Sequence, residues 1–423
     1  MLILDKQALK LSMGRKKQRF FYGYIIAGIG FFLILIGAAI VTSYSVFFKP
    51  LAIEFGWTRA MISGAYAMCF FLGGLLGILT GRLTDRFGPR LLVTASGFLL
   101  GLGCLLMSQT NTIWQLYLFF GVMVGVSQGC RLVPIISTVS RWFINRKGLM
   151  TGIVTSGVGC GQVIGPILAS QLITNYGWRT SYIIMGLVAL VAIVIAAQFL
   201  RRDPSKMGLL PYGDRELNQE KGLAPEDEDL SFREAVNTKR LWTLSTIYFC
   251  FGFFAVAISL HIVPHVTDLG ISIVSAAAIL STIGGMSIAG RIGTGSVVDR
   301  IGGKQSLIIV FILATAALFW LQFAKELWMF YLFAIIFGLS WGGSVASQAP
   351  ILAESFGMRE HGAILGLVIF SVSLGGTIGP LLAGHLFDVI GNYQLIFLVF
   401  TILSLTSLIL ALLLKPTKKR RHC

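Results

Sequence analysis

Long apolar runs, each about the thickness of a lipid bilayer, constrain this chain more than any other feature. A membrane-spanning helix needs about 20 mainly apolar residues. We expect twelve spans, at 21–48, 61–81, 91–109, 114–140, 148–171, 180–200, 241–265, 273–298, 305–323, 328–355, 361–387 and 393–414. Only 12% of the 423 residues are charged, against roughly 25% in a soluble domain. The sequence therefore predicts an all-α, multi-pass membrane protein. It excludes a soluble enzyme, a disulfide-rich secreted domain and a disordered chain.

The apolar runs fall into two sets of six on either side of a polar stretch. We expect a basic tail over 1–20, a first bundle over 21–200, a linker over 201–240, a second bundle over 241–414 and a basic tail over 415–423. The acidic run at 226–229 is interpreted as solvated chain rather than a metal site. Neither a metal site nor a cofactor site is predicted.

Basic residues lie on one side of the predicted spans. Of the 34 Lys and Arg residues, 28 fall in the tails, in the linker and on one set of alternate loops, whereas four fall on the loops of the other side. This positive-inside pattern predicts that both termini are cytoplasmic. We interpret the net charge of +16 as contact with anionic lipid headgroups rather than nucleic acid.

The two sets of runs repeat one another at a constant offset of 214 residues along the chain. Residues 81–88 (GRLTDRFG) match 295–302 (GSVVDRIG), and 161–166 (GQVIGP) match 375–380 (GGTIGP). We call two residues that are related by this offset equivalent positions. Two parallel six-span repeats with a binding site between them near the bilayer midplane are typical of secondary transporters.

The first repeated motif carries an acidic residue beside an arginine at the end of a span. Asp85 and Arg86 form one such pair, and Asp299 and Arg300 form the other. Charge pairs at the membrane surface contribute roughly 0–1 kcal/mol, which suits a gate that must open. We expect these four residues to act in gating. Simple orientation of the protein by positive charge is the alternative.

Two arginines, Arg291 and Arg131, lie inside predicted spans. An arginine at the centre of a span costs about 2.5–3.5 kcal/mol on insertion scales, so it is expected to face a cavity or a partner. The planar guanidinium suits a carboxylate. Snorkelling or pairing with another helix is the alternative for each residue. If both reach one cavity, a dianion or an organophosphate is the alternative substrate class.

Other polar side chains in the spans are candidates for supporting roles. His261, near the end of the seventh span, titrates near neutral pH and is a candidate for proton coupling. Its spacing from His265 could suit a metal, but no third ligand is apparent. Candidates for neutral hydrogen bonds to a substrate are Tyr44, Tyr66, Gln128 and Ser347.

Three sequence motifs resemble those of one transporter family. The segment 81–90 (GRLTDRFGPR) and its second copy resemble the signature loop between spans two and three of the major facilitator superfamily. Residues 45–60 (SVFFKPLAIEFGWTRA) and 141–152 (RWFINRKGLMTG) resemble the end of span one and the entry to span five in monocarboxylate porters and oxalate/formate-type antiporters. The resemblance implies twelve transmembrane helices in two six-helix bundles.

The resemblance also implies roles for two basic residues. Arg291, after Ala289 and Gly290, looks like the span-eight arginine that binds the substrate carboxylate in these porters. Lys49 matches a lysine that receives the anion or proton, although an interfacial lysine is the alternative. The chain departs from the pattern where animal-type porters carry an aspartate, which is Ser287 here, and this puts proton coupling through that pair in doubt. No lysine lies between 362 and 414, which argues against oxalate.

These features together predict a secondary transporter of small organic anions in the cell membrane. A monocarboxylate such as lactate or pyruvate is expected, moved by alternating access with a proton or a counter-anion. We expect a monomer. The alternatives are a dicarboxylate or organophosphate antiporter, a drug efflux pump and, from another class, a solute-binding membrane sensor. No nucleophile–base set suggests an enzyme.

Overall fold

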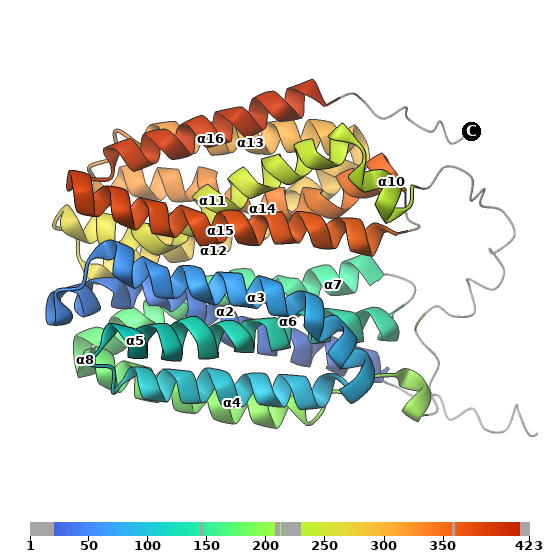
Figure 1. Ribbon diagram of the computed structural model, residues 1–423, viewed down its shortest axis with the longest axis horizontal. Coiled ribbons are helices and arrows are strands. Elements are labelled where there is room, and N and C mark those ends of the chain that lie inside the picture. Colours follow the sequence, from blue (N-terminus) through green and yellow to red (C-terminus); the bar gives the residue numbers. More distant parts are fainter. Residues whose placement is uncertain (1–20, 144–146, 208–211, 213–229, 358–359, 415–423) are drawn as a thin grey trace, which may run out of the picture.

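The protein is helical throughout the part of the chain that the structure describes. The computed structural model describes residues 21–143, 147–207, 212, 230–357 and 360–414, and its helices run side by side along the long axis (Figure 1). In chain order they are α2 (Tyr22–Phe55), α3 (Arg59–Phe87), α4 (Pro89–Met107), α5 (Ile113–Leu116), the π-helix η1 (Tyr117–Val124), α6 (Gly125–Trp142), α7 (Lys147–Thr155), α8 (Gly157–Ala197), the 3-10 turn η2 (Pro204–Met207), α10 (Phe232–Val236), α11 (Lys239–Asp268), α12 (Ile273–Ile301), α13 (Gly303–Leu321), α14 (Leu327–Phe356), α15 (His361–Ile390) and α16 (Gln394–Leu413).

Eleven continuous helical segments in the described chain are long and apolar enough to cross a membrane, whereas the sequence predicts twelve spans. The difference lies in one segment of 48 residues, Met150–Ala197. Its backbone is not helical at Gly177, where φ is 76° and ψ is 164°. This break divides the segment where the fifth and sixth predicted spans meet. The predicted all-α membrane fold is therefore confirmed.

The two ends of the helix bundle differ in what they carry. At one end of the bundle, α2 and α11 begin and α16 ends. We call this the terminal end, and we call the other end the opposite end. The short helix α10 and the end of α16 are both at the terminal end (Figure 1). The helices before the polar stretch, α2 to α8, are called the first set, and α11 to α16 the second set.

The internal repeat is visible in the backbone at equivalent positions. Gly177 and Gly391, which form one such pair, both have positive φ, 76° and 79°. A Cβ built at Gly165 would lie 2.3 Å from the carbonyl oxygen of Ala39, and one built at Gly379 would lie 2.1 Å from that of Phe253. Ala39 and Phe253 are themselves equivalent positions, so both members of this contact repeat.

Alanine at Gly177 is expected to destabilise the protein more than alanine at Gly391. Gly391 has left-handed backbone (φ 79°, ψ 3°), which costs a residue with a Cβ about 1–2 kcal/mol. Gly177 lies in a region essentially reserved for glycine, where the cost is about 1–3 kcal/mol. No described atom lies within 4 Å of either built Cβ, so the pair isolates backbone strain. Thermal unfolding in detergent measures it, and a G177A protein with the higher melting temperature would contradict this order.

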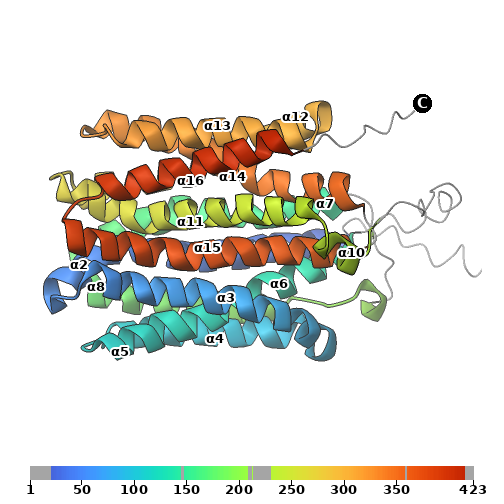
Figure 2. The same ribbon diagram turned by 45° about the horizontal axis from the view of Figure 1, so that its top comes forward.

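The most extensive contacts between the two sets in the described chain are those of α3 with α15, α8 with α12, and α2 with α11. The first pair lies side by side in both views (Figure 2). At the opposite end, a Cβ at Gly384 of α15 would lie 2.8 Å from the carbonyl oxygen of Arg59. Further along, a Cβ at Gly74 of α3 would lie 2.7 Å from the Ser373 side chain. The stretch of α3 from Arg59 to Gly74 corresponds to about 22 Å of helix.

On α15, the close contact with α3 at Ser373 and Gly74 is not repeated at Gly366, which lies nearer the terminal end. Gly366 lies about two turns before Ser373 on α15 and so on the same face. A Cβ built at Gly366 meets no described atom within 4 Å. The two sets are therefore closed against each other from the opposite end to the middle of the bundle.

The polar stretch between the sets is attached to each of them. The backbone N–H of Tyr212 donates to the carbonyl oxygen of Trp142 at 3.0 Å, and its ring packs against Phe21 and Phe143. The N–H of Leu230 donates to the carbonyl oxygen of Phe356 at 3.1 Å. The first attachment is to the first set and the second to the second set. The acidic run at 226–229 lies outside the described residues.

Candidate functional site

Arg291 lies on α12 at the contact between the two sets. Its Nη1 donates to the carbonyl oxygen of Thr155, the last residue of α7, at 2.9 Å. Its Nε is buried and has no hydrogen-bond partner. None of the described carboxylates forms an ion pair with Arg291. A guanidinium carries five N–H donors, so this cation keeps unused binding capacity.

A second buried donor lies on the same contact between α8 and α12. Gln162 is only 3% exposed, and its Nε2 has no hydrogen-bond partner. A Cβ at Gly284 of α12 would lie 2.8 Å from the Cβ of Gln162. Gly284 precedes Arg291 on this helix by about 10 Å of axial rise. Gln162 is not among the residues that the sequence predicts for the site, although it lies in the repeated glycine motif.

Arg131 lies on α6, inside the first set, and is 5% exposed. Its Nη1 donates to Ser127 Oγ at 3.2 Å and more weakly to Ser96 Oγ at 3.5 Å. The guanidinium packs against α2, where a Cβ at Gly37 would lie 1.9 Å from its Cζ. These contacts come from α2, α4 and α6 and include no described carboxylate. The partners of Arg131 and those of Arg291 are thus different residues.

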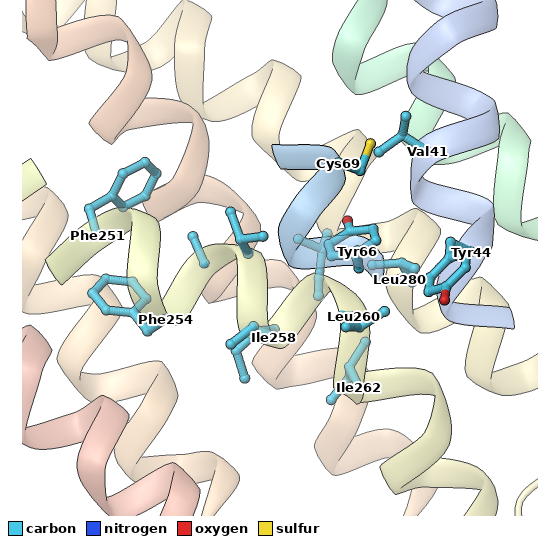
Figure 3. Close-up of a cluster of buried hydrophobic side chains, with 14 of the residues drawn as sticks. Val41, Tyr44, Tyr66, Cys69, Phe251, Phe254, Ile258, Leu260, Ile262 and Leu280 are labelled. Atoms are coloured by element: carbon cyan, nitrogen blue, oxygen red, sulfur yellow. The ribbon is translucent and has the colours of Figure 1, made fainter. Parts of the chain in front are cut away.

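The two predicted tyrosines lie together. The rings of Tyr44 and Tyr66 are stacked at 5.5 Å, and Phe120 of η1 stacks on Tyr44 at 3.9 Å. Figure 3 shows both tyrosines in a buried cluster that also holds Leu260 and Leu280 of the second set. The Tyr44 hydroxyl donates to the carbonyl oxygen of Ile62 at 3.0 Å. Part of its hydrogen-bonding capacity is therefore used within the protein.

Ser347 and Gln128 lie in different sets. The Ser347 hydroxyl is 3.2 Å from that of Tyr248 and donates to the carbonyl oxygen of Ser344 at 3.0 Å. Gln128 Oε1 accepts a weak hydrogen bond from Cys69 Sγ at 3.9 Å. Each side chain thus binds neighbours from its own set.

Lys49 belongs to a charged cluster that joins the two sets at the opposite end. Its Nζ lies 3.2 Å from Asp268 Oδ1, and Arg59 pairs with the other oxygen of the same carboxylate. Arg59 Nη1 also donates to the Tyr393 hydroxyl at 2.6 Å. The first two backbone N–H groups of α3 donate to the two oxygens of Asp388 at 2.9 and 2.8 Å. We call Lys49, Arg59, Asp268, Asp388 and Tyr393 the cross-set cluster.

His261 contacts the cross-set cluster through Tyr393 and is 1% exposed. Its Nε2 is 3.1 Å from the carbonyl oxygen of Pro380 and 3.2 Å from Ser63 Oγ. A carbonyl only accepts, so Nε2 carries the hydrogen and Nδ1 accepts from the Tyr393 hydroxyl at 3.0 Å. Burial raises the pKa of the Tyr393 phenol, which lies between α15 and α16, well above its ordinary value of 10. Tyr393 is therefore a neutral donor to His261.

The predicted gating pairs at the terminal end fall largely outside the described part of the chain. This applies to the side chains of Asp85, Asp299 and Arg300. Arg86 is exposed, and its guanidinium lies 5.2 Å from the ring of Phe87. Their role in gating stays a prediction.

Four members of the cross-set cluster are not among the site residues predicted from the sequence, namely Arg59, Asp268, Asp388 and Tyr393. These residues lie at the ends of different spans, where a charge is ordinary, and no local motif connects them. The internal repeat offered one signal, because its constant offset aligns Asp268 with Glu54 and Tyr393 with Arg179.

The chain matches known proteins over most of its length. It is 26% identical to monocarboxylate transporter 7 of Homo sapiens, over 87% of this chain and 81% of that protein. It is 25% identical to monocarboxylate transporter 13 of Rattus norvegicus, over 89% and 85%. The crystal structure of a bacterial homolog of the human lysosomal transporter Spinster, in an inward-facing and unoccupied conformation, covers 94% of this chain and 95% of its own, with a TM-score of 0.68 and 17% identity.

The sequence profile of one family matches nearly all of the chain, over residues 20–349 and 288–422. These residues hold the helices of both sets, and the Spinster homolog shares their arrangement. The chain therefore belongs to the Major Facilitator Superfamily and is a multi-pass membrane transporter.

Proposed function

We propose that the protein carries a small organic monocarboxylate, of the lactate or pyruvate class, across the cell membrane. The observation that carries this proposal is the state of Arg291. Its guanidinium lies between the two sets with a buried, unpartnered Nε, and no described carboxylate neutralises it. A buried cation without an acidic partner favours an anionic ligand, and a planar guanidinium favours a carboxylate.

The relatives support this substrate class, because the two proteins compared above are named monocarboxylate transporters. Arg131 and Lys49 would add positive charge along the path of the anion. Tyr44, Tyr66, Gln128 and Ser347 would supply neutral hydrogen bonds once the two sets move apart.

Transport would follow alternating access, with the bundle over 21–200 rocking against that over 241–414. The terminal end would lie in the cytoplasm, as the bias of basic residues predicts. Asp85, Arg86, Asp299 and Arg300 would form the gate at that end. Coupling would be to a proton, through His261 or Lys49, or to a counter-moving anion.

Purified protein in liposomes tests this proposal with labelled lactate. We expect uptake above that of protein-free liposomes, and competition by unlabelled pyruvate. An inward-directed proton gradient and an outward-directed counter-anion gradient, imposed separately, distinguish the two coupling modes. Competition only by succinate or glycerol phosphate would replace the monocarboxylate with a dianion. Transport of a cationic dye without lactate uptake would replace it with drug efflux.

A further inference from the structure

Each set has an acidic residue at one pair of equivalent positions, and the two residues are neutralised in different ways. In the first set, Glu54 at the end of α2 accepts from Arg179 Nη2 at 2.6 Å and also from Trp178 Nε1. Arg179 also donates to the carbonyl oxygens of Ser108 and Thr110 at 2.9 and 3.1 Å. Glu54 therefore keeps its cation whatever the second set does.

The equivalent acidic residue in the second set has lost that partner. Asp268 is the position equivalent to Glu54, and Tyr393 is the position equivalent to Arg179. A phenol cannot neutralise a carboxylate at neutral pH. The cations that pair with Asp268 are Lys49 and Arg59, both from the first set.

Opening of the opposite end must therefore break these ion pairs. Separation would remove Lys49 and Arg59 from Asp268, and it would remove the N-terminus of α3 from Asp388. The charged and titratable groups around Asp268 are Lys49 on α2, Arg59 on α3, Asp388 on α15, Tyr393 after α15 and His265 on α11 itself. After separation, the second set would hold carboxylates without arginine or lysine, and the first set would hold free cations.

We propose that Asp268 is the proton-binding residue of the transport cycle. It takes up one proton from the solution when the opposite end opens, which forms an O–H bond and neutralises the carboxylate. Lys49 and Arg59, released in the same step, attract the anion. One proton and one monocarboxylate then enter together, so the inference deepens the proposed function and depends on it for the identity of the anion.

Closure returns Lys49 and Arg59 to Asp268 and displaces its proton. The proton passes to the carboxylate of the anion that these cations attracted, so the O–H bond of Asp268 breaks as an O–H bond forms on the anion. Tyr393 positions Arg59 for this return, because its hydroxyl accepts from Arg59 and donates to His261 Nδ1.

The distance between the two sets tests this proposal without a substrate. Trp114 and Trp328 are each replaced by a cysteine that carries a spin label, in a variant without native cysteines. The two tryptophans occupy equivalent positions and are 79% and 57% exposed. We expect the parent protein to gain a longer distance as the pH falls. D268N should show the longer distance at every pH, whereas D268E should keep the pH response.

The matched control is E54Q, which alters the equivalent acid that has a partner in its own set. It should keep the pH response of the parent. A D268N protein that responds to pH like the parent would overturn the proposal. Loss of the pH response in E54Q would also overturn it, as would loss of the response in H261Q together with a normal response in D268N.

Labelled-anion uptake separates this inference from the proposed function. D268N should lose proton-driven accumulation at least tenfold and keep anion exchange across the membrane. If the parent carries no monocarboxylate, the proposed function fails while the distance measurement still decides the role of Asp268. If the parent accumulates lactate on a proton gradient and D268N does so equally, the inference alone fails.

Discussion

Replacing Arg291 by glutamine is expected to reduce monocarboxylate uptake by about 100-fold. Glutamine can still donate hydrogen bonds, but it cannot neutralise a carboxylate. Hydrogen bonds to charged groups contribute about 1.5–3 kcal/mol, and 1.4 kcal/mol corresponds to about tenfold in affinity. R291K should retain part of the activity, because lysine keeps the charge and loses the planar fork. Initial rates of labelled-lactate uptake into proteoliposomes measure both effects.

The matched control removes a positive charge far from this site. Lys325 is exposed in the turn between α13 and α14, and K325Q should transport like the parent. Size-exclusion profiles in detergent establish that each variant is folded. A monodisperse R291Q protein with more than half the parental uptake would remove Arg291 from substrate binding.

Valine at Gly379 is expected to prevent accumulation of folded protein, as is valine at Gly165. A Cβ at Gly379 would lie 2.1 Å from the Phe253 carbonyl oxygen, and one at Gly165 would lie 2.3 Å from that of Ala39. Both neighbours are backbone atoms of a packed helix, so neither can turn aside as a side chain can. Overpacking costs typically 1–3 kcal/mol and more where the backbone must shift, and we expect about 3 kcal/mol or more at each site. The yield of monodisperse protein measures the loss.

Gly366 provides the control on the same helix as Gly379. A Cβ there meets no described atom within 4 Å, so G366V changes helix propensity by only a few tenths of a kcal/mol. We expect G366V to be recovered at nearly the parental yield. Equal yields of G366V and G379V would show that the close contact of α11 with α15 does not limit stability.

The fold was predictable because its signals are long and local. Apolar runs of membrane thickness need no knowledge of tertiary contacts, and the constant offset of the repeat follows from the glycine motifs alone. The boundary that the sequence predicts between the fifth and sixth spans, between 171 and 180, contains the break at Gly177. A helical segment continues on both sides of Gly177, and only its backbone angles reveal the break.

The candidate site was predictable only one residue at a time. Arg291 stands out because an arginine inside a span is costly. That Arg131 binds Ser127 inside the first set, whereas Arg291 contacts Thr155 across the two sets, depends on how helices rotate about their axes. The pairing of Lys49 with Asp268 joins residues from opposite halves of the chain. The composition of a span does not reveal which residue of another span pairs with it.

The attachments at Tyr212 and Leu230 decide how much freedom the connecting chain leaves to the two bundles. Residues 213–229 separate the anchored positions, and a chain of that length can reach about 56 Å when fully extended. The connection therefore sets only an upper limit of this size on the separation of Tyr212 and Leu230, so the spacing of the two bundles depends on the helix faces that meet.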